Sequence, residues 1–511
     1  MRPVGLVIAG LGVLVAATSA LAQGTAPTNG TVAAPGTSIV VPVPAARLVP
    51  RTDASHPFGA ADMMQQPVAL AAAGYVEDEF FVSGTANLYD WNADGTVSVR
   101  HRALPYTTRI LVRRPSDPMR FSGTVLLDMG NLGAGFDTFG VWNHLSSHLL
   151  SRGHAYVGVT VFGGNIGALR MFNRARYGEL SYPKPVEACA AARRDAWNRP
   201  AEFFPPAEDG IRWDVMSQVA ALVKSDAAAR PLAGYRVERA YAAMQSGGDL
   251  PTYVNAFSRH LRLANGKPVY DAFLIKDSGG PRLALNACAK PVPEGDPRRI
   301  IRNAGVPVMQ ILSQNAVSAA IRRPDSDAPG DQFRLYEVPG ASHFDKWQYS
   351  YPAVADLAAA GVPPLSAFWI FPSECRPHHV AMNGFPLPYI FSGAFANLDA
   401  WVRHGTAPPR AAFIELNGQG IVADEFGNAR GGVRTPWVDV PAATFHEAME
   451  GRSSTQFRCD DNGYWTPLPW ARLEKAYGSS AAYSERFRAA VARLVAERWV
   501  TPEDGKTITD F

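Results

Sequence analysis

Cysteine is scarce in this sequence. The 511 residues include four, Cys189, Cys288, Cys375 and Cys459, and no two of them form a CxxC pair. Zinc sites and redox centres built on that spacing are therefore excluded. In an oxidising compartment the even number permits two disulfides, and four cysteines allow three pairings, among which the sequence does not choose.

Charge is also limited, since only 19% of the residues are charged and the formal net charge is +3. A balance this close to neutral gives no reason to expect a nucleic acid or a membrane surface as partner. The adjacent His378 and His379 do not indicate a metal site, because neighbouring histidines rarely bind one ion and no suitably spaced carboxylate accompanies them. We expect neither a metal nor an organic cofactor.

Long apolar runs are lacking except at the N-terminus, where Val4 to Ala17 follow the basic Arg2 and precede Ala20-Leu21-Ala22. This pattern predicts a signal peptide over residues 1–22 that is cleaved after Ala22, and hence a periplasmic or secreted protein with no membrane span after cleavage. The alternative is an uncleaved anchor, against which the short apolar run argues. Residues 23–55 are rich in Gly, Pro, Thr and Ala, which predicts a disordered linker.

The stretch from Val237 to Leu261 organises the rest of the chain. A short apolar run ends at Met244, and a turn with the sequence Gln-Ser-Gly-Gly follows it. Apolar residues at helical spacing come next, at Leu250, Val254, Phe257 and Leu261. A strand, a tight turn with one serine and a helix form the nucleophile elbow of α/β-hydrolases, with Ser246 as the nucleophile. Met244 replaces the first small residue of the usual G-x-S-x-G pattern, so an ordinary glycine-rich connection is the alternative.

The surrounding pattern predicts an α/β fold, namely an α/β-hydrolase fold with a mostly parallel central sheet flanked by helices. Residues 56–511 form this domain, with cap insertions at about 164–210 and 281–304 and a C-terminal segment at about 352–511. Antiparallel strands are predicted within 75–112, parallel strands within 124–137, 154–162, 270–280, 306–317 and 333–345, and helices within 213–224, 390–402 and 484–499.

His343 follows the last predicted strand and is expected to be the general base, which takes the proton from Ser246 and returns it to the leaving group. A lone histidine is more often structural, but this one lies downstream of a serine elbow, in the chain order of the fold. The backbone N–H of Gly247, with that of Leu132 or Gly133 in the loop after the strand at 124, is expected to hold the oxyanion.

The acid of the triad is the least determined element. The position after the strand ending near Leu312 reads Ser313-Gln314-Asn315-Ala316 and contains no carboxylate. We therefore predict Asp325 as the acid. Asp327 and Asp277 remain alternatives, as does the absence of any acid, and each aspartate can also be an ordinary solvated loop residue.

Several motifs together resemble a family of long secreted bacterial α/β-hydrolase-domain proteins, over roughly residue 60 to the C-terminus. They are Gln245-Ser246-Gly247, the run from RRPDSD to FRLYEVPGASHFD (322–345), LDAWVRHGTAPP (398–409) and GNARGGVRTPWVDVPAATF (427–445). The resemblance implies an α/β-hydrolase fold, an ester-hydrolase-like site with Ser246 and His343, and either a pocket-rim or a packing role for residues 427–445. Family members usually have a carboxylate in the loop where Gln314-Asn315-Ala316 stand.

The sequence thus predicts a secreted serine hydrolase that cleaves a small-molecule carboxylic ester through an acyl-enzyme. One alternative is a binding protein of this fold with a decayed site, which the missing acid motivates. Another is an acyltransferase or amidase that uses the same residues. The sequence determines neither the identity of the ester nor the oligomeric state.

Overall fold

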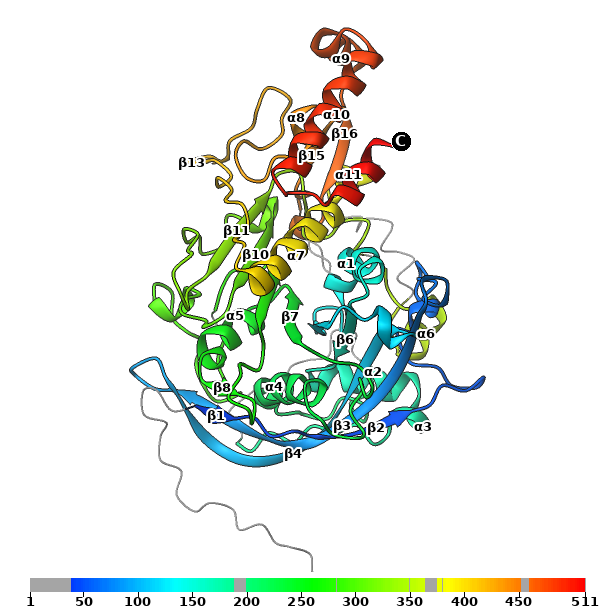
Figure 1. Cartoon of the computed structure of the whole chain (residues 1–511), viewed down its shortest axis with the longest axis vertical. Helices are drawn as coiled ribbons and strands as arrows, with labels where there is room; N and C mark the ends of the chain where they lie inside the picture. The colour runs from blue at the N-terminus through cyan, green and yellow to red at the C-terminus, as the bar shows by residue number, and fades with distance from the viewer. Residues whose placement is uncertain are drawn as a thin grey trace, which may run out of the picture.

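The computed structural model describes residues 38–187, 199–281, 283–348, 350–363, 375–378, 380–451 and 459–510. Its main feature is a nine-stranded sheet with the strand order β11-β10-β9-β7-β5-β6-β4-β3-β2 within these ranges (Figure 1). The strands are β2 (Ala45–Val49), β3 (Tyr75–Trp91), β4 (Val97–Pro115), β5 (Thr124–Met129), β6 (Ala155–Val159), β7 (Arg239–Gln245), β9 (Ala272–Lys276), β10 (Val308–Ser313) and β11 (Phe333–Val338).

The six strands from β11 to β6 run parallel, whereas β4, β3 and β2 continue the sheet in antiparallel fashion. Parallel neighbours place their carboxyl ends at one edge of the sheet, where ligands bind in open α/β folds. The predicted mostly parallel α/β-hydrolase sheet is confirmed.

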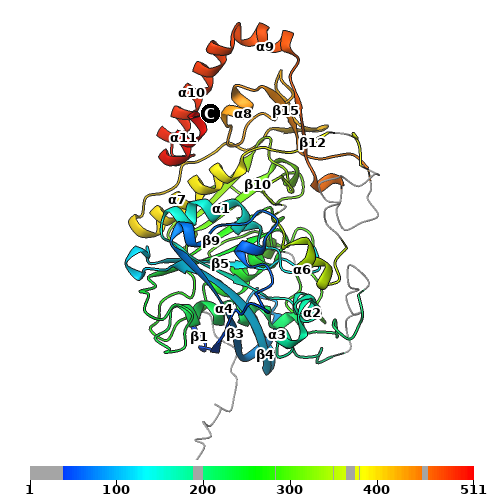
Figure 2. The ribbon, with the colours of Figure 1, turned by 90° about the vertical axis from the view of Figure 1, so that its right-hand side faces the viewer.

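Alternating side chains of the parallel strands pack into two separate cores. In β5, Val125 and Leu127 face one core and Leu126 faces the other. Helices α4 and α5 lie on the first side, whereas α1 and α7 cover the second (Figures 1 and 2). Because both faces are covered, the residues of these strands are almost all buried and most of them are apolar.

The helices are α1 (Gly140–Ser151), α2 (Gly163–Phe172), α3 (Arg174–Tyr177), α4 (Arg212–Val223), α5 (Asp249–Tyr253), α6 (Val354–Ala359), α7 (Leu387–His404), α8 (Pro436–Asp439), α9 (Trp470–Tyr477), α10 (Ser480–Ala496) and α11 (Pro502–Thr509). The remaining strands are β1 (Ile39–Val40), β8 (Leu261–Arg262), β12 (Ala381–Met382), β13 (Leu416–Asn417), β14 (Gly420–Ile421), β15 (Ala443–His446) and β16 (Tyr464–Pro467). The predicted helix at 213–224 corresponds to α4, all of whose residues are buried.

The linker predicted for residues 23–55 does not extend as far as expected. Residues 45–49 form β2, which pairs antiparallel with residues 79–83 of β3, and residues 39–40 pair with β8. The composition of this stretch gives no core-forming signal, but the unpaired edge of β3 offers a row of backbone partners. Predictions for residues 1–22 and for Cys189 and His379 fall outside the described residues.

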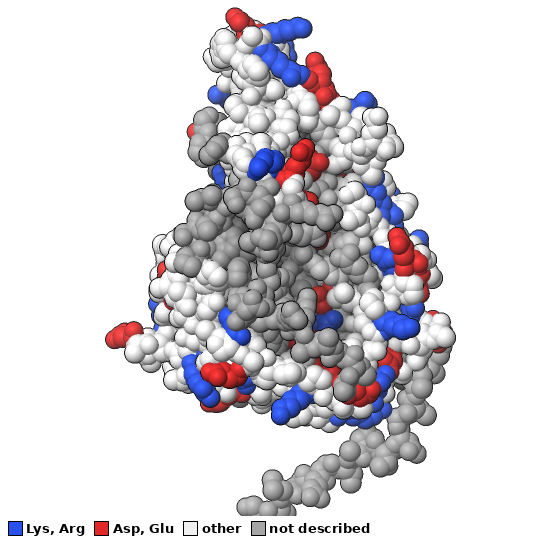
Figure 3. All heavy atoms as spheres, turned by 180° about the vertical axis from the view of Figure 1, so that it is seen from behind, with Lys and Arg blue, Asp and Glu red and all other residues white. Residues whose placement is uncertain are grey.

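The C-terminal segment extends from the sheet as a lobe containing β15, β16 and α8 to α11 (Figures 1 and 2). A disulfide joins Cys375 to Cys459 within it. None of the helices in the described part of the chain is both long enough and apolar enough to cross a membrane. Acidic and basic side chains are interspersed on the face seen in Figure 3, in keeping with the near-neutral net charge.

Candidate active site

The serine turn follows β7 at the carboxyl edge of the sheet. Ser246 has a φ of 68° and Gly247 a φ of 65°. A positive φ is unusual for a residue with a side chain, and strain of this kind is typical of a nucleophile elbow. The Ser246 N–H donates to the carbonyl of Lys276 at 2.8 Å, which fixes the turn against the end of β9. The helix α5 starts three residues later, at Asp249.

His343 is paired with a buried carboxylate, which belongs to Asp277. The His343 Nδ1 lies 3.1 Å from the Asp277 Oδ2, and the carboxylate is fully buried whereas the ring is 13% exposed. Asp277 directly follows β9, the neighbour of β7, and His343 follows β11. The topology therefore brings the residues after three parallel strands to one edge of the sheet.

Four donors surround the Asp277 carboxylate. Its Oδ1 accepts hydrogen bonds from the Ser313 N–H at 2.6 Å and the Ser313 hydroxyl at 2.7 Å. Its Oδ2 accepts one from the Lys276 ammonium at 2.7 Å and faces His343. Burial alone would raise the pKa of the Asp277 carboxyl, but the charge of Lys276 and the hydrogen bond and charge of His343 outweigh it. The pKa therefore lies below its ordinary value, and the group is ionised at neutral pH.

Asp325, the predicted acid, lies elsewhere. Its Oδ1 accepts the Leu335 N–H at 3.0 Å, and its Oδ2 is 3.8 Å from the Arg334 Nε. Asp327, the second candidate, pairs with Arg334 and Arg410. Asp325 thus provides an acceptor for an outer backbone amide of β11, the edge strand, whereas Asp327 neutralises arginine side chains beside it. Of the three candidate aspartates, Asp277 is therefore the one whose carboxylate contacts His343.

The loop after β5 is tied to the serine turn by Asn131. Its Nδ2 donates to the carbonyl of Gln245 at 2.9 Å, and its Oδ1 accepts the Gly133 N–H at 2.6 Å. The Gly133 N–H is therefore engaged, whereas no described residue accepts a hydrogen bond from the N–H of Leu132 or Gly247. Of the predicted oxyanion donors, these two fit the role better than Gly133.

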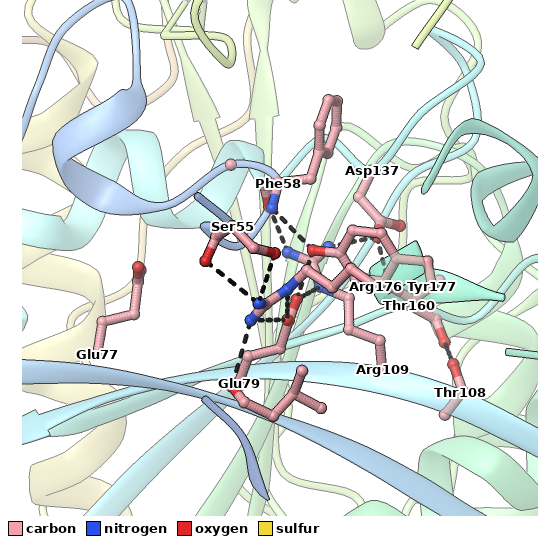
Figure 4. Close-up of polar contacts among 12 residues, drawn as sticks. Ser55, Phe58, Glu77, Glu79, Thr108, Arg109, Asp137, Thr160, Arg176 and Tyr177 are labelled. Atoms are coloured by element: carbon pink, nitrogen blue, oxygen red, sulfur yellow. Dashed lines mark hydrogen bonds and ion pairs between the residues drawn. The ribbon is translucent and has the colours of Figure 1, made fainter. Parts of the chain in front are cut away.

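A buried charge network holds the far end of the same loop (Figure 4). Arg109 Nε donates to Glu79 at 2.8 Å, and its Nη1 lies 3.2 Å from the Asp137 Oδ2. Arg176 reaches Glu79 from the other side, at 2.6 Å. Burial raises the pKa of the Asp137 carboxyl despite the opposing charge of Arg109. Because Asp137 ends the loop that starts at Asn131, this network fixes the loop to the antiparallel strands β3 and β4.

The C-terminal segment contacts the histidine loop directly. The Phe344 N–H donates to the Asp461 carbonyl at 2.8 Å, and the Lys346 N–H donates to the Asn383 carbonyl at 3.1 Å. The motif at 427–445 packs on the sheet edge, because the Val433 N–H donates to the Glu337 carbonyl of β11 at 2.7 Å. This contact corresponds to the packing alternative rather than to the pocket rim.

Sequence reasoning missed two residues of this cluster, Lys276 and Ser313. The available signal for Lys276 was a lysine at the end of an otherwise apolar strand, next to an aspartate. Ser313 was noted only as part of a stretch without a carboxylate.

Among the described residues, no group of three His, Cys, Asp or Glu side chains could hold a metal ion.

Comparisons with known proteins agree with this architecture. A family model described as an alpha/beta hydrolase domain matches residues 40–510. Solved structures with some similarity include the esterase Est22, with 13% identity over 48% of this chain and 66% of that one and a TM-score of 0.26. Another is the carboxylesterase Cest-2923 from Lactobacillus plantarum WCFS1, with 10% identity over 41% and 67% and a TM-score of 0.23.

A third is the poly(3-hydroxybutyrate) depolymerase LpqC from Bordetella parapertussis, with 14% identity, 47% and 70% coverage and a TM-score of 0.24. TM-scores this low do not by themselves establish a common fold, so the assignment rests on the family match. A search of curated proteins found no match.

Proposed function

The chain belongs to the alpha/beta hydrolase domain family, and on that premise we propose that it is a serine hydrolase of small-molecule carboxylic esters. The observation that carries the proposal is the contact of His343 with the buried Asp277 at the edge where the strained Ser246 turn lies. In α/β-hydrolases the nucleophile, the acid and the histidine follow one another in this order along the chain. The same order holds for Ser246, Asp277 and His343, although the aspartate follows β9 and not β10. We also propose that a signal peptide at residues 1–22 directs export of the protein.

In the proposed reaction, His343 takes the proton of the Ser246 hydroxyl as the oxygen attacks the ester carbonyl. The N–H groups of Gly247 and Leu132 receive the oxyanion of the tetrahedral intermediate. His343 then protonates the leaving alcohol, and water, activated by the same ring, releases the acid. Asp277 accepts the Nδ1–H of the ring, which leaves Nε2 free to act, and it stabilises the imidazolium.

The contact of Asp277 with His343 removes the reason for the binding-protein alternative, which depended on the absence of an acid. Transfer of the acyl group to an alcohol, or cleavage of an amide, would use the same residues. Product analysis with an added alcohol separates transfer from hydrolysis, because transfer yields a new ester in place of the free acid.

We expect the purified mature protein to be labelled by a fluorophosphonate probe, and Ser246→Ala to abolish the labelling. An activated serine attacks the phosphorus, whereas ordinary serines do not. The matched control is Ser258→Ala. Ser258 is the last residue of the helical segment Val254–Ser258 that continues α5, and its hydroxyl donates to the Ala304 carbonyl at 2.6 Å. Labelling is read by gel fluorescence and intact mass. A wild-type protein that stays unlabelled while an esterase standard reacts would contradict the proposal.

A further inference from the structure

Lys276 is a fully buried charged residue that contacts the groups of the candidate site from the end of β9. Its carbonyl accepts the Ser246 N–H at 2.8 Å. Its ammonium donates to the Asp277 Oδ2 at 2.7 Å and to the His343 carbonyl at 3.1 Å, and its side chain is 0% exposed. One residue thus connects the serine turn, the acid and the histidine loop.

A buried ammonium is costly to desolvate, and a strand end inside an apolar sheet does not require one. The preceding residues of β9, Ala272 to Ile275, are all apolar and buried. An apolar residue would continue this pattern with no loss of sheet pairing. The charge is therefore best explained by the groups that it contacts.

The position of the charge matters because the ammonium and the His343 ring share the same carboxylate oxygen. A carboxylate beside a histidine favours the protonated ring, and a cation on that carboxylate opposes this effect. We propose that Lys276 is a positioning residue that holds Asp277 and His343 in place and keeps the His343 ring unprotonated, and so able to act as base, at lower pH. This inference rests on the proposed function.

Other charged groups around the cluster already have partners of their own. On the serine side, Asp249 pairs with Arg212 at 2.6 Å. On the histidine loop, Asp345 pairs with His144 at 3.0 Å. From the C-terminal segment, Glu447 accepts the Gln314 Nε2 at 2.8 Å.

From β10, the uncharged Ser313 faces Asp277. Asp461 reaches the loop through its backbone carbonyl, which accepts the Phe344 N–H. The charged side chains that contact the Asp277 carboxylate at 3.1 Å or less are those of Lys276 and His343, within the described part of the chain. Removing the ammonium should therefore expose the ring to an uncompensated carboxylate.

The test compares wild type with Lys276→Met and Lys276→Gln, which are neutral, and Lys276→Arg, which keeps the charge. Lys224→Met is the matched control. Lys224 forms an ion pair of 2.8 Å with Asp271, the residue that precedes the first residue of β9. Two quantities are measured. One is kcat/KM for a chromogenic ester between pH 5 and 9, and the other is the pH midpoint of protonation of the His343 ring, followed by NMR of histidine-labelled protein and assigned with His343→Gln.

In both neutral variants we expect the acid limb of the kcat/KM profile, and the protonation midpoint of the ring, to move up by about one pH unit. At pH values on that limb, kcat/KM should fall about tenfold relative to wild type, whereas the loss near pH 8 should be smaller. Lys276→Arg and Lys224→Met should keep the wild-type acid limb.

Neutral variants that fold and keep the wild-type midpoint would overturn the proposal. Failure of both neutral variants to fold would also overturn it, in favour of a purely structural lysine. The ring titration does not depend on turnover. A protein that does not hydrolyse esters therefore contradicts the proposed function, whereas an unshifted ring midpoint contradicts the role of Lys276.

Discussion

Replacement of Asp277 by asparagine is expected to lower kcat for ester hydrolysis by about 10⁴-fold, with a small change in KM. In the proposed reaction, the carboxylate accepts the Nδ1–H of His343 and stabilises the imidazolium that forms when Ser246 loses its proton. An amide at this position can offer an N–H to Nδ1 instead, which holds the ring in the wrong tautomer. The measurement is steady-state kinetics at pH 8.

Asp325→Asn is the matched control, since the Asp325 carboxylate lies beside the edge strand, where it accepts the Leu335 N–H and pairs with Arg334. It should retain kcat within about threefold, because Asp325 lies away from the proposed reacting groups and the amide oxygen of asparagine can still accept the Leu335 N–H. Circular dichroism and tryptophan fluorescence establish that both variants fold, a needed check because Asp277→Asn leaves Lys276 without its carboxylate partner. Equal losses in the two variants would reject Asp277 as the acid.

Arg109→Met is expected to lower the free energy of unfolding by about 3–5 kcal/mol. Arg109 is 1% exposed and joins Glu79 to Asp137 in the network of Figure 4. Its removal leaves the buried Asp137 carboxyl with neutral donors only, from Thr160 and Asn165. Glu79 keeps Arg176 and the hydroxyl of Tyr177. The measurement is chemical denaturation followed by tryptophan fluorescence.

The control for this prediction is Arg47→Met. Arg47 forms an ion pair of 2.6 Å with Glu179, but its side chain is 55% exposed. Solvent-exposed pairs contribute about 0–1 kcal/mol, so this variant should unfold close to wild type. Denaturation midpoints that coincide for the two variants would show that the buried network does not stabilise the fold.

The network also bears on activity, because Asp137 closes the loop that presents the Leu132 N–H. A loop released at Asp137 would still be tied at Asn131, through the Gln245 carbonyl. We therefore attribute to Arg109 a mainly structural role at one end of the loop, and to Asn131 the direct link between this loop and the serine turn.

The sequence by itself predicted those features that depend on local pattern. Buried parallel strands have continuous apolar runs, so β5, β7, β9, β10 and β11 could be located within a few residues. The serine turn is a local motif of strand, tight turn and helix, and its strain at Ser246 is a consequence of that motif. The order of serine before histidine along the chain completed the assignment of fold and family.

Only the tertiary structure decided which carboxylate meets His343. Asp277 and His343 are separated by 66 positions, and no local pattern relates them. They meet because β9 and β11 flank β10 and end at the same edge. Tertiary structure also decided the conformation of β2. The composition of its residues is typical of a linker, and they form a strand because the edge of β3 offers backbone partners.

Lys276 illustrates why the sequence alone did not determine these contacts. A lysine next to an aspartate in sequence is ordinarily a solvated pair, and its meaning changes when the fold removes both from water. Burial depends on which elements pack over the residue, and this is a property of the whole chain. The sequence specified which groups are available for chemistry, and tertiary packing determined which of them are buried, paired and aligned.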